Sequence, residues 1–356
     1  MDRKWRYLIN SVFIVCSFVI CALLAVNLKK EEGQQENQKL DGFDVFLEGE
    51  EISALYMAGD SLWVGGRDGV KRLDLSTGQI LDYVAEDLQL IYAAEICRDG
   101  DGNVWIGHNT GVTVLGEAGE RRDFAEPELT GGRVNTILCL QDEVLVGTME
   151  GANRFTEVDG AWKVTEKYTS DNGLLSNVVN VLAKDDDRLL IGSYLDNRPG
   201  GISILDEAGW KHLTIEQGLA HPYINAILPL EEKVLVATGQ LTAGGLNVLT
   251  RKADSYVVTD TYTVEDGIPG DKVRWLYLDS REHLWITTES NGLLVCADGE
   301  LTHPIDGVLL TEEKGLSDNE IKKIVESEEY YWLAGRYGLT RIEKAAIEKC
   351  LEGESR

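Results

Sequence analysis

The chain has 356 residues, of which 61 are acidic and 34 are basic, so its formal net charge is −27. Such an acidic excess argues against nucleic acid as a partner, because nucleic-acid binding requires a basic surface. It also disfavours anionic lipid headgroups as a partner of the folded part, and it suits a protein that stays soluble outside the cell. A chain of this length could form two ordinary domains, but we expect a single domain.

The N-terminal region predicts a membrane anchor. Residues 1–7 form a short cytoplasmic stub, and residues 8–28 are 21 residues without a charge, enough to span the bilayer as a helix. An uncleaved anchor is favoured over a signal peptide because the apolar stretch is long and lacks a small-x-small exit. Three basic residues precede the span and two follow it, which places the N-terminus in the cytoplasm and the remainder outside the cell.

After the span, residues 29–42 have almost no apolar content and predict a flexible linker. Residues 43–47 then alternate between apolar and polar side chains, as a strand does. This strand precedes the first of the repeats described below, although it resembles the fourth strand of such a repeat. The strands with which it pairs must therefore lie elsewhere in the chain.

A short core motif, an aromatic or aliphatic residue followed by an aliphatic and then a small residue, recurs along the chain. Its seven copies are separated by 42, 40, 45, 45, 50 and 47 residues. They are Trp63-Val64-Gly65, Trp105-Ile106-Gly107, Leu145-Val146-Gly147, Leu190-Ile191-Gly192, Leu235-Val236-Ala237, Trp285-Ile286-Thr287 and Trp332-Leu333-Ala334. A period near 45 built from short strands is typical of β-propeller blades.

The repeats therefore predict an all-β fold, a seven-bladed β-propeller of four-stranded antiparallel blades, preceded by one transmembrane helix. The propeller spans residues 43–343, with blades near 51–89, 90–131, 132–176, 177–220, 221–270, 271–318 and 319–343. The seventh repeat has no fourth strand of its own, so residues 43–47 should complete it and remove two sheet edges. Residues 344–356 form a charged, helix-like C-terminal tail.

Two further landmarks accompany the core motif. A glycine followed by an apolar residue comes after each copy, and Gly-Leu lead-ins such as Gly173-Leu174-Leu175-Ser176-Asn177 precede several first strands. With the turn Asp99-Gly100-Asp101-Gly102-Asn103 before Trp105-Ile106-Gly107, this pattern resembles the two-component regulator propeller repeat. That family builds extracytoplasmic sensor domains of bacterial hybrid sensor kinases. The resemblance implies glycans or their breakdown products as possible ligands.

Three sets of residues are candidates for metal binding or for a disulfide. The turn at residues 99–103 has alternating carboxylates but lacks the bidentate glutamate of a calcium loop, so a plain hairpin turn is favoured. The five histidines lack metal-ligand spacing, and no metal or other cofactor is expected. Cys97 and Cys139 occupy matching first-strand positions in neighbouring blades, where small buried hydrophobic residues are favoured over a disulfide.

Candidate ligand-binding residues fall on one face of the predicted disc. The entries to the first strands carry Ser53, Ala93, Asn135, Asn180, Asn225, Arg274 and Lys322 at equivalent positions. The last five suit hydrogen bonding to a sugar or an anion, although a structural role for the asparagines, bonding the neighbouring backbone, is equally consistent with the pattern. Insertions in blades four and five add Tyr194, Asp196, Arg198 and Gln240, and a short loop adds Arg336.

No catalytic motif is present, so the function predicted is binding: a membrane-anchored, extracytoplasmic sensor module for a ligand or a protein. A small molecule or glycan is the expected ligand. Signalling would pass through a membrane or envelope protein partner, because no kinase follows the last blade. The alternatives are an extracytoplasmic lyase or hydrolase with its site at the central opening, and a non-catalytic envelope scaffold.

Overall fold

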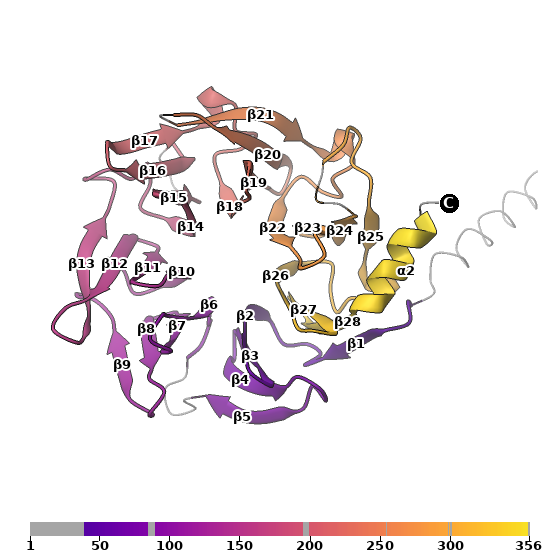
Figure 1. Cartoon of the computed structure of the whole chain (residues 1–356), viewed down its shortest axis with the longest axis horizontal. Coiled ribbons are helices and arrows are strands. Elements are labelled where there is room, and N and C mark those ends of the chain that lie inside the picture. Colours follow the sequence, from indigo (N-terminus) through magenta and orange to yellow (C-terminus); the bar gives the residue numbers. More distant parts are fainter. Residues whose placement is uncertain are drawn as a thin grey trace, which may run out of the picture.

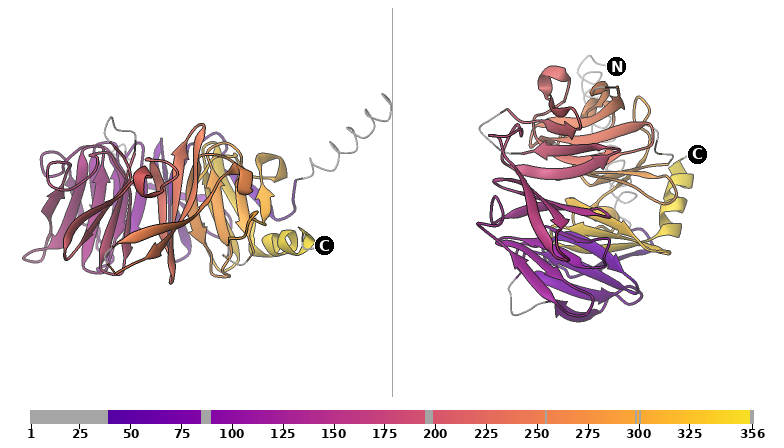
Figure 2. Two further views of the ribbon diagram at one scale, coloured as in Figure 1. Left: turned by 90° about the horizontal axis from the view of Figure 1, so that it is seen from above. Right: turned by 60° about the vertical axis from the view of Figure 1, so that its left-hand side comes forward.

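The computed structural model of the chain describes residues 39–84, 90–194, 199–253, 255–297, 299 and 301–354. Seven four-stranded antiparallel sheets stand radially around one axis, and each sheet has its first strand innermost (Figure 1). Seen edge-on, they form a thick disc (Figure 2). The seven-bladed propeller predicted from the repeats is therefore confirmed.

The first four blades follow one another along the chain. Their strands are β2 (Ile52–Ala58), β3 (Ser61–Gly66), β4 (Gly69–Asp74) and β5 (Ile80–Val84) in blade one; β6 (Glu95–Arg98), β7 (Val104–His108), β8 (Gly111–Leu115) and β9 (Arg121–Phe124) in blade two; β10 (Val134–Cys139), β11 (Glu143–Thr148), β12 (Gly151–Glu157) and β13 (Trp162–Tyr168) in blade three; and β14 (Val179–Asp185), β15 (Arg188–Ser193), β16 (Ile202–Asp206) and β17 (Gly209–Leu213) in blade four.

The remaining blades continue in the same order. Their strands are β18 (Ile224–Pro229), β19 (Lys233–Gln240), β20 (Ala243–Arg251) and β21 (Tyr256–Tyr262) in blade five; β22 (Val273–Leu278), β23 (Leu284–Thr288), β24 (Leu293–Cys296) and β25 (Val308–Leu310) in blade six; and β26 (Ile321–Glu326), β27 (Tyr330–Gly335) and β28 (Gly338–Glu343) in blade seven. Short 3-10 helices at Ile215–Gln217, Val264–Asp266 and Glu312–Lys314 precede three of the Gly-Leu or Gly-Ile lead-ins.

The N-terminal strand β1 (Phe43–Phe46) closes the ring. It pairs antiparallel with β28, from Phe43 opposite Ile342 to Phe46 opposite Leu339, and so supplies the fourth strand of blade seven. Arg341 Nη2 lies 2.6 Å from Asp44 Oδ2 across this pair, and the Phe46 ring packs 5.6 Å from the Trp332 ring. The pairing predicted for this strand is present, and it removes an exposed edge on each side.

The core lies between the blades. Trp105, Trp285 and Trp332 are fully buried, each between its own blade and a neighbour, whereas Trp63 is only partly buried. The first two of these indoles each donate a hydrogen bond to an aspartate. Asp99 Oδ2 accepts from Trp105 Nε1 at 2.8 Å, and Asp279 Oδ2 accepts from Trp285 Nε1 at 3.0 Å. The Asp99 carboxylate also accepts the backbone N–H groups of its own turn, which fits the plain-turn interpretation.

Cys97 and Cys139 form a disulfide, which corrects the expectation of two buried hydrophobic residues. Cys97 is in β6 of blade two and Cys139 is in β10 of blade three, and their Cα atoms are 6.1 Å apart. Cys97 lies opposite Trp105 of its second strand and Cys139 lies opposite Val144 of its own, so the two positions differ by one residue in register. The close approach of neighbouring innermost strands brings the two sulfur atoms together. The bond ties two neighbouring blades covalently near the central axis.

The residues after β28 form helix α2 (Lys344–Glu354), which packs on blades six and seven at the edge of the disc (Figures 1 and 2). Ala346 and Ile347 are buried in the same core cluster as Trp285. Within the described residues no helix is long and apolar enough to cross a membrane, and the span predicted at residues 8–28 lies outside them.

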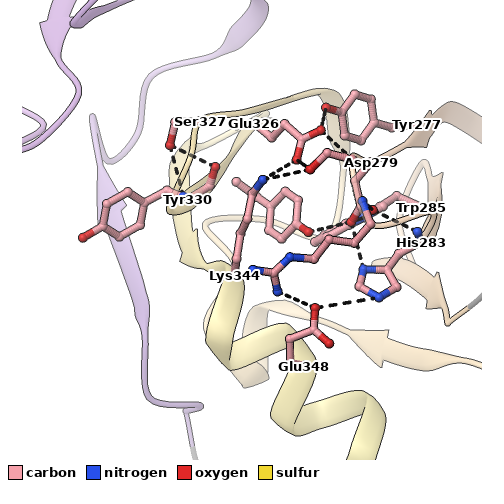
Figure 3. A network of polar contacts seen from close by, with 12 residues as sticks. Tyr277, Asp279, His283, Trp285, Glu326, Ser327, Tyr330, Lys344 and Glu348 are labelled. Carbon is pink, nitrogen blue, oxygen red and sulfur yellow. Dashed lines mark hydrogen bonds and ion pairs between the residues drawn. The ribbon is translucent and has the colours of Figure 1, made fainter.

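A polar network holds α2 in place (Figure 3). Lys344 Nζ forms an ion pair with Glu326 of β26 and lies 3.2 Å from Ser280 Oγ, while Arg281 pairs with Glu348. The predicted charged tail is thus a packed helix for most of its length, because its apolar side chains reach the outer core of the two blades.

Candidate functional site

One position on each innermost strand faces the central channel. In six blades the pairing of the first and second strands shifts by one residue there, which marks a β-bulge. A bulge adds one residue to a strand and changes the direction of its side chain relative to the usual alternation between the two faces of the sheet. In this propeller the bulge residues line the cavity at the central axis. The residues at this position form what we call the inner ring: Ser53, Ala94, Asn135, Asn180, Asn225, Arg274 and Lys322.

Blade two departs from this pattern. Its register shows no shift: Glu95 pairs with Gly107, and the N–H of Ala94 donates to Gly107 O at 2.8 Å. The ring position is therefore Ala94, which lines the channel, and the expectation of Ala93 was wrong by one residue. Ala93 is fully buried between blades one and two instead.

The three asparagines of the inner ring join successive blades. Asn135 Nδ2 donates to Val179 O at 2.9 Å, Asn180 Nδ2 donates to Ile224 O at 2.8 Å, and Asn225 Nδ2 donates to Val273 O at 2.8 Å. In each pair the acceptor directly precedes the ring residue of the next blade. The side-chain N–H groups of these asparagines are therefore used in hydrogen bonds that hold neighbouring blades together. This is the structural role that the sequence had left open as an alternative to ligand binding. No hydrogen bond to their Oδ1 atoms is found among the described residues, so the carbonyl ends remain acceptors.

Ion pairs continue the ring where the asparagines end. Arg274 Nη2 lies 3.3 Å from Glu320 Oε1 of the next blade, and Lys322 Nζ lies 2.6 Å from Glu51 Oε1 of blade one. The hydrogen bond from Lys322 holds the pKa of Glu51 below its ordinary value, more than burial raises it. Each of these two side chains reaches the residue just before the first strand of the next blade, whereas the asparagines reach the first residue of that strand.

Further charged side chains lie close to these ion pairs. Burial disfavours ionisation of Glu289, but Arg274 and Lys272 outweigh burial and lower its pKa. Deeper in the channel, Lys323 Nζ lies 2.6 Å from Glu95 Oε2 and 4.0 Å from the centre of the Trp275 ring. Lys323 therefore connects blades seven, six and two across the channel.

The inner ring lines a cavity of about 400 Å³ at the centre of the disc. Two arginines from loops, Arg67 of the β3–β4 hairpin and Arg133 just before β10, also line it, together with Tyr92. All five ring residues proposed from the sequence as ligand contacts are among its lining residues: Asn135, Asn180, Asn225, Arg274 and Lys322.

Three other proposed contacts, Tyr194, Gln240 and Arg336, are not among the residues that line this cavity. Tyr194 packs with Tyr223, with ring centres 5.2 Å apart, and lies 5.5 Å from Lys272 Nζ. Gln240 ends β19 in the long hairpin of blade five. Arg336 is exposed, 3.6 Å from Glu320. Asp196 and Arg198 lie outside the described residues.

Sequence reasoning missed part of the lining. The lining residues that were not predicted from the sequence as ligand contacts include Arg67, Arg133, Tyr92, Glu51, Glu95 and Lys323. Glu95 and Lys323 directly follow inner-ring residues in the sequence. Their positions in the first strands could therefore have indicated that they lie near the channel. Arg133 and Tyr92 stand in loops of different length, where the repeat provides no alignment.

Comparisons with known proteins establish the fold. No protein-family model matches the chain, and no curated protein matches its sequence. Solved structures do match. The extracellular domain assigned to a hybrid two component system of B. thetaiotaomicron has a TM-score of 0.69 and 18% identity, over 86% of this chain and 42% of that one. One assigned to a one component system of the same organism has a TM-score of 0.63 and 16% identity, over 85% and 40%.

A third similar structure is an enzyme. Virginiamycin B lyase from Staphylococcus aureus has a TM-score of 0.62 and 13% identity, over 85% of this chain and 98% of that one. The chain spans about two fifths of the length of the two sensor structures. The chain has the seven-bladed propeller fold of these extracellular sensor domains, and at such identities the likeness is one of fold.

Proposed function

We propose that this chain is a ligand- or protein-binding propeller of a bacterial sensory system, and that a small molecule or glycan binds in the central cavity. The observation that carries the proposal is the cavity of about 400 Å³, in which polar and charged side chains of the inner ring converge. A concave site with converging polar groups on a rigid scaffold is what a small-ligand site requires.

Binding is proposed in preference to catalysis. Virginiamycin B lyase shares the fold, but a lyase or hydrolase needs a group poised to transfer a proton. Among the described residues that line the cavity there is no histidine, and both carboxylates, Glu51 and Glu95, are paired with lysines. The hydrogen bond from Lys322 lowers the pKa of Glu51 and weakens this carboxylate as a proton acceptor.

The proposed location is extracytoplasmic, with residues 8–28 as a membrane anchor and a membrane or envelope protein as signalling partner. Two observations support the location: the disulfide between Cys97 and Cys139, since disulfides persist in oxidising compartments, and the similarity to extracellular sensor domains. The full chain should stay with membranes in an alkaline wash, and protease added to spheroplasts should degrade it. Recovery in the soluble fraction would contradict the anchor.

Ligand binding is tested on the full chain in detergent micelles, by melting followed through tryptophan fluorescence. The ligands are neutral and acidic saccharides and amino acids, and a specific ligand raises the melting temperature by mass action. The variant Ala94→Trp fills the cavity and should abolish the shift. Ala208→Trp, in the exposed β16–β17 turn, adds the same side chain elsewhere and should keep it. A shift that survives Ala94→Trp would place the ligand at another site.

A further inference from the structure

The side chains of the inner ring link successive blades around most of the cavity but not beside blade two. From blade three round to blade one, each ring residue reaches the next blade through an asparagine amide or an ion pair. At blades one and two the ring residues are Ser53 and Ala94, whose side chains are too short to do so. We call the part of the cavity wall in front of blade two, where the inner-ring side chains Ser53 and Ala94 are short, the open sector.

Two guanidinium groups flank this open sector. Arg67 belongs to blade one and Arg133 to blade three, and both are exposed side chains that line the cavity. Neither has an ion-pair partner within 4 Å among the described residues, although Arg67 is near enough to lower the pKa of Glu51. By contrast, Arg274, Lys322 and Lys323, which line the same cavity, all have carboxylate partners.

The charge of the cavity is opposite to that of the chain. Its lining contains five cationic side chains and two carboxylates, within a protein whose net charge is −27. Although the protein is so acidic, Arg67 and Arg133 have no carboxylate within pairing distance in the part of the chain that the structure describes. A cationic recess in an acidic surface focuses the local field and attracts small anions.

The two sides of the cavity differ in hydrogen-bonding character. Guanidinium groups donate to oxyanions in a fixed fork geometry. Farther round the ring, Asn180 and Asn225 have given their amide donors to the backbone, as Asn135 beside Arg133 has. What remains is their carbonyl oxygens, which accept from hydroxyl groups. A ligand that satisfies both sides carries an oxyanion at one end and hydroxyl groups at the other.

We propose that the cavity binds a polyhydroxylated ligand bearing an oxyanion group, a carboxylate, sulfate or phosphate, and that Arg67 and Arg133 hold this group. A sugar acid or a sugar phosphate fits this description. The inference rests on the proposed function, since it names the ligand class of the same cavity. Tyr92, exposed beside Arg67, forms the wall of the open sector, and its N–H donates to Arg67 O at 3.2 Å.

The test compares matched ligands on the full chain in micelles. D-glucuronate and D-glucose 6-phosphate should raise the melting temperature and bind at least about tenfold more tightly than D-glucose, the neutral counterpart. Affinity should fall as salt is raised, because the guanidinium groups are exposed. If inorganic phosphate stabilised the chain as strongly as the sugar phosphate, the hydroxyl part of the proposal would be overturned.

The variants test the two arginines. Arg67→Gln and Arg133→Gln should each weaken glucuronate binding about tenfold, and the double variant more. The unliganded melting temperature should not change, because both side chains are exposed. The control Arg122→Gln removes an equal charge from β9 at the outer edge and should leave binding intact. Unchanged affinity in the double variant would refute the assignment.

Failure of this inference is distinguishable from failure of the proposed function. If D-glucose binds as tightly as glucuronate and Ala94→Trp blocks both, the cavity is a ligand site but the anionic class is wrong. If no small ligand of either class produces a shift that Ala94→Trp abolishes, both the ligand class and the cavity function are overturned.

Discussion

The side-chain amide of Asn225 donates to the backbone carbonyl of Val273, 2.8 Å away, and so joins the innermost strands of blades five and six. Asn225 is buried and also donates to Gly239 O at 3.1 Å in its own blade. A residue proposed from the sequence as a ligand contact is therefore first a link between blades. A substitution of Asn225 is therefore expected to change the stability of the propeller as well as any ligand binding.

Asn225→Ala should destabilise the protein by about 2 kcal/mol, because two buried carbonyls would lose their donor. Urea unfolding followed by tryptophan fluorescence measures the change. Asn109→Ala, in the β7–β8 hairpin of blade two, serves as the matched control and should stay within about 0.5 kcal/mol of the parent. Equal stability of the two variants would show that the bonds to Gly239 and Val273 contribute little.

The Cys97–Cys139 disulfide should contribute about 2–4 kcal/mol, since the sequence separation of 42 residues closes a long loop in the unfolded chain. The double variant Cys97→Ala, Cys139→Ala should lose that amount in urea unfolding. Reductant should lower the stability of the parent to the level of the variant and leave the variant unchanged. A parent insensitive to reductant at denaturing concentrations of urea would contradict this account.

The repeats allowed the fold to be predicted because each blade carries the same local signals. The core motif marks the buried second strand, and the missing fourth strand of blade seven identifies Phe43–Phe46 as its completion. The disulfide was not predictable in the same way. Cys97 and Cys139 both lie on first strands, one residue apart in register. Whether their Cα atoms come within bonding range depends on the spacing of the blades at the axis, which no local pattern encodes.

The candidate site was predictable in part for a similar reason. Asn135, Asn180 and Asn225 recur at the repeat period, so the inner ring could be located from spacing alone. The absence of a bulge in blade two displaced its ring residue to Ala94. Arg67 and Arg133 come from loops of different blades, and only the closed ring places them around one cavity.

Closure by β1 should be a measurable part of stability. Phe46→Ala removes the ring that packs on Trp332 and lies 5.1 Å from the Arg341 guanidinium, and should cost about 2–3 kcal/mol, less than for a fully buried phenylalanine. Chemical denaturation measures the loss. Asp44→Asn in the same strand weakens only an exposed ion pair with Arg341 and should cost less than about 1 kcal/mol. Equal losses would mean that backbone pairing alone closes the ring.

Asp279 should make stability depend on pH. Its buried carboxylate accepts from Tyr331 Oη at 2.6 Å and from Trp285 and His283 (Figure 3). Burial alone would raise its pKa, but these hydrogen bonds outweigh burial and lower the pKa below the ordinary value of 3.8. A carboxylate with a lowered pKa stabilises the fold above its unfolded-state pKa, and this contribution is lost as pH falls through the folded-state value.

Asp279→Asn should therefore cost about 2–4 kcal/mol at pH 7, because the neutral amide cannot accept all of these bonds. The difference from the parent should stay constant down to about pH 4, near the pKa of an unfolded aspartate, and narrow below it as the parent carboxylate is protonated. Urea unfolding at pH 7, 5, 4 and 3 measures it. Asp159→Asn, whose side chain is 88% exposed, is the control and should show no such narrowing. A difference between parent and Asp279→Asn that persisted unchanged at pH 3 would show that the charge of Asp279 is not what stabilises the packing of blade six on blade seven.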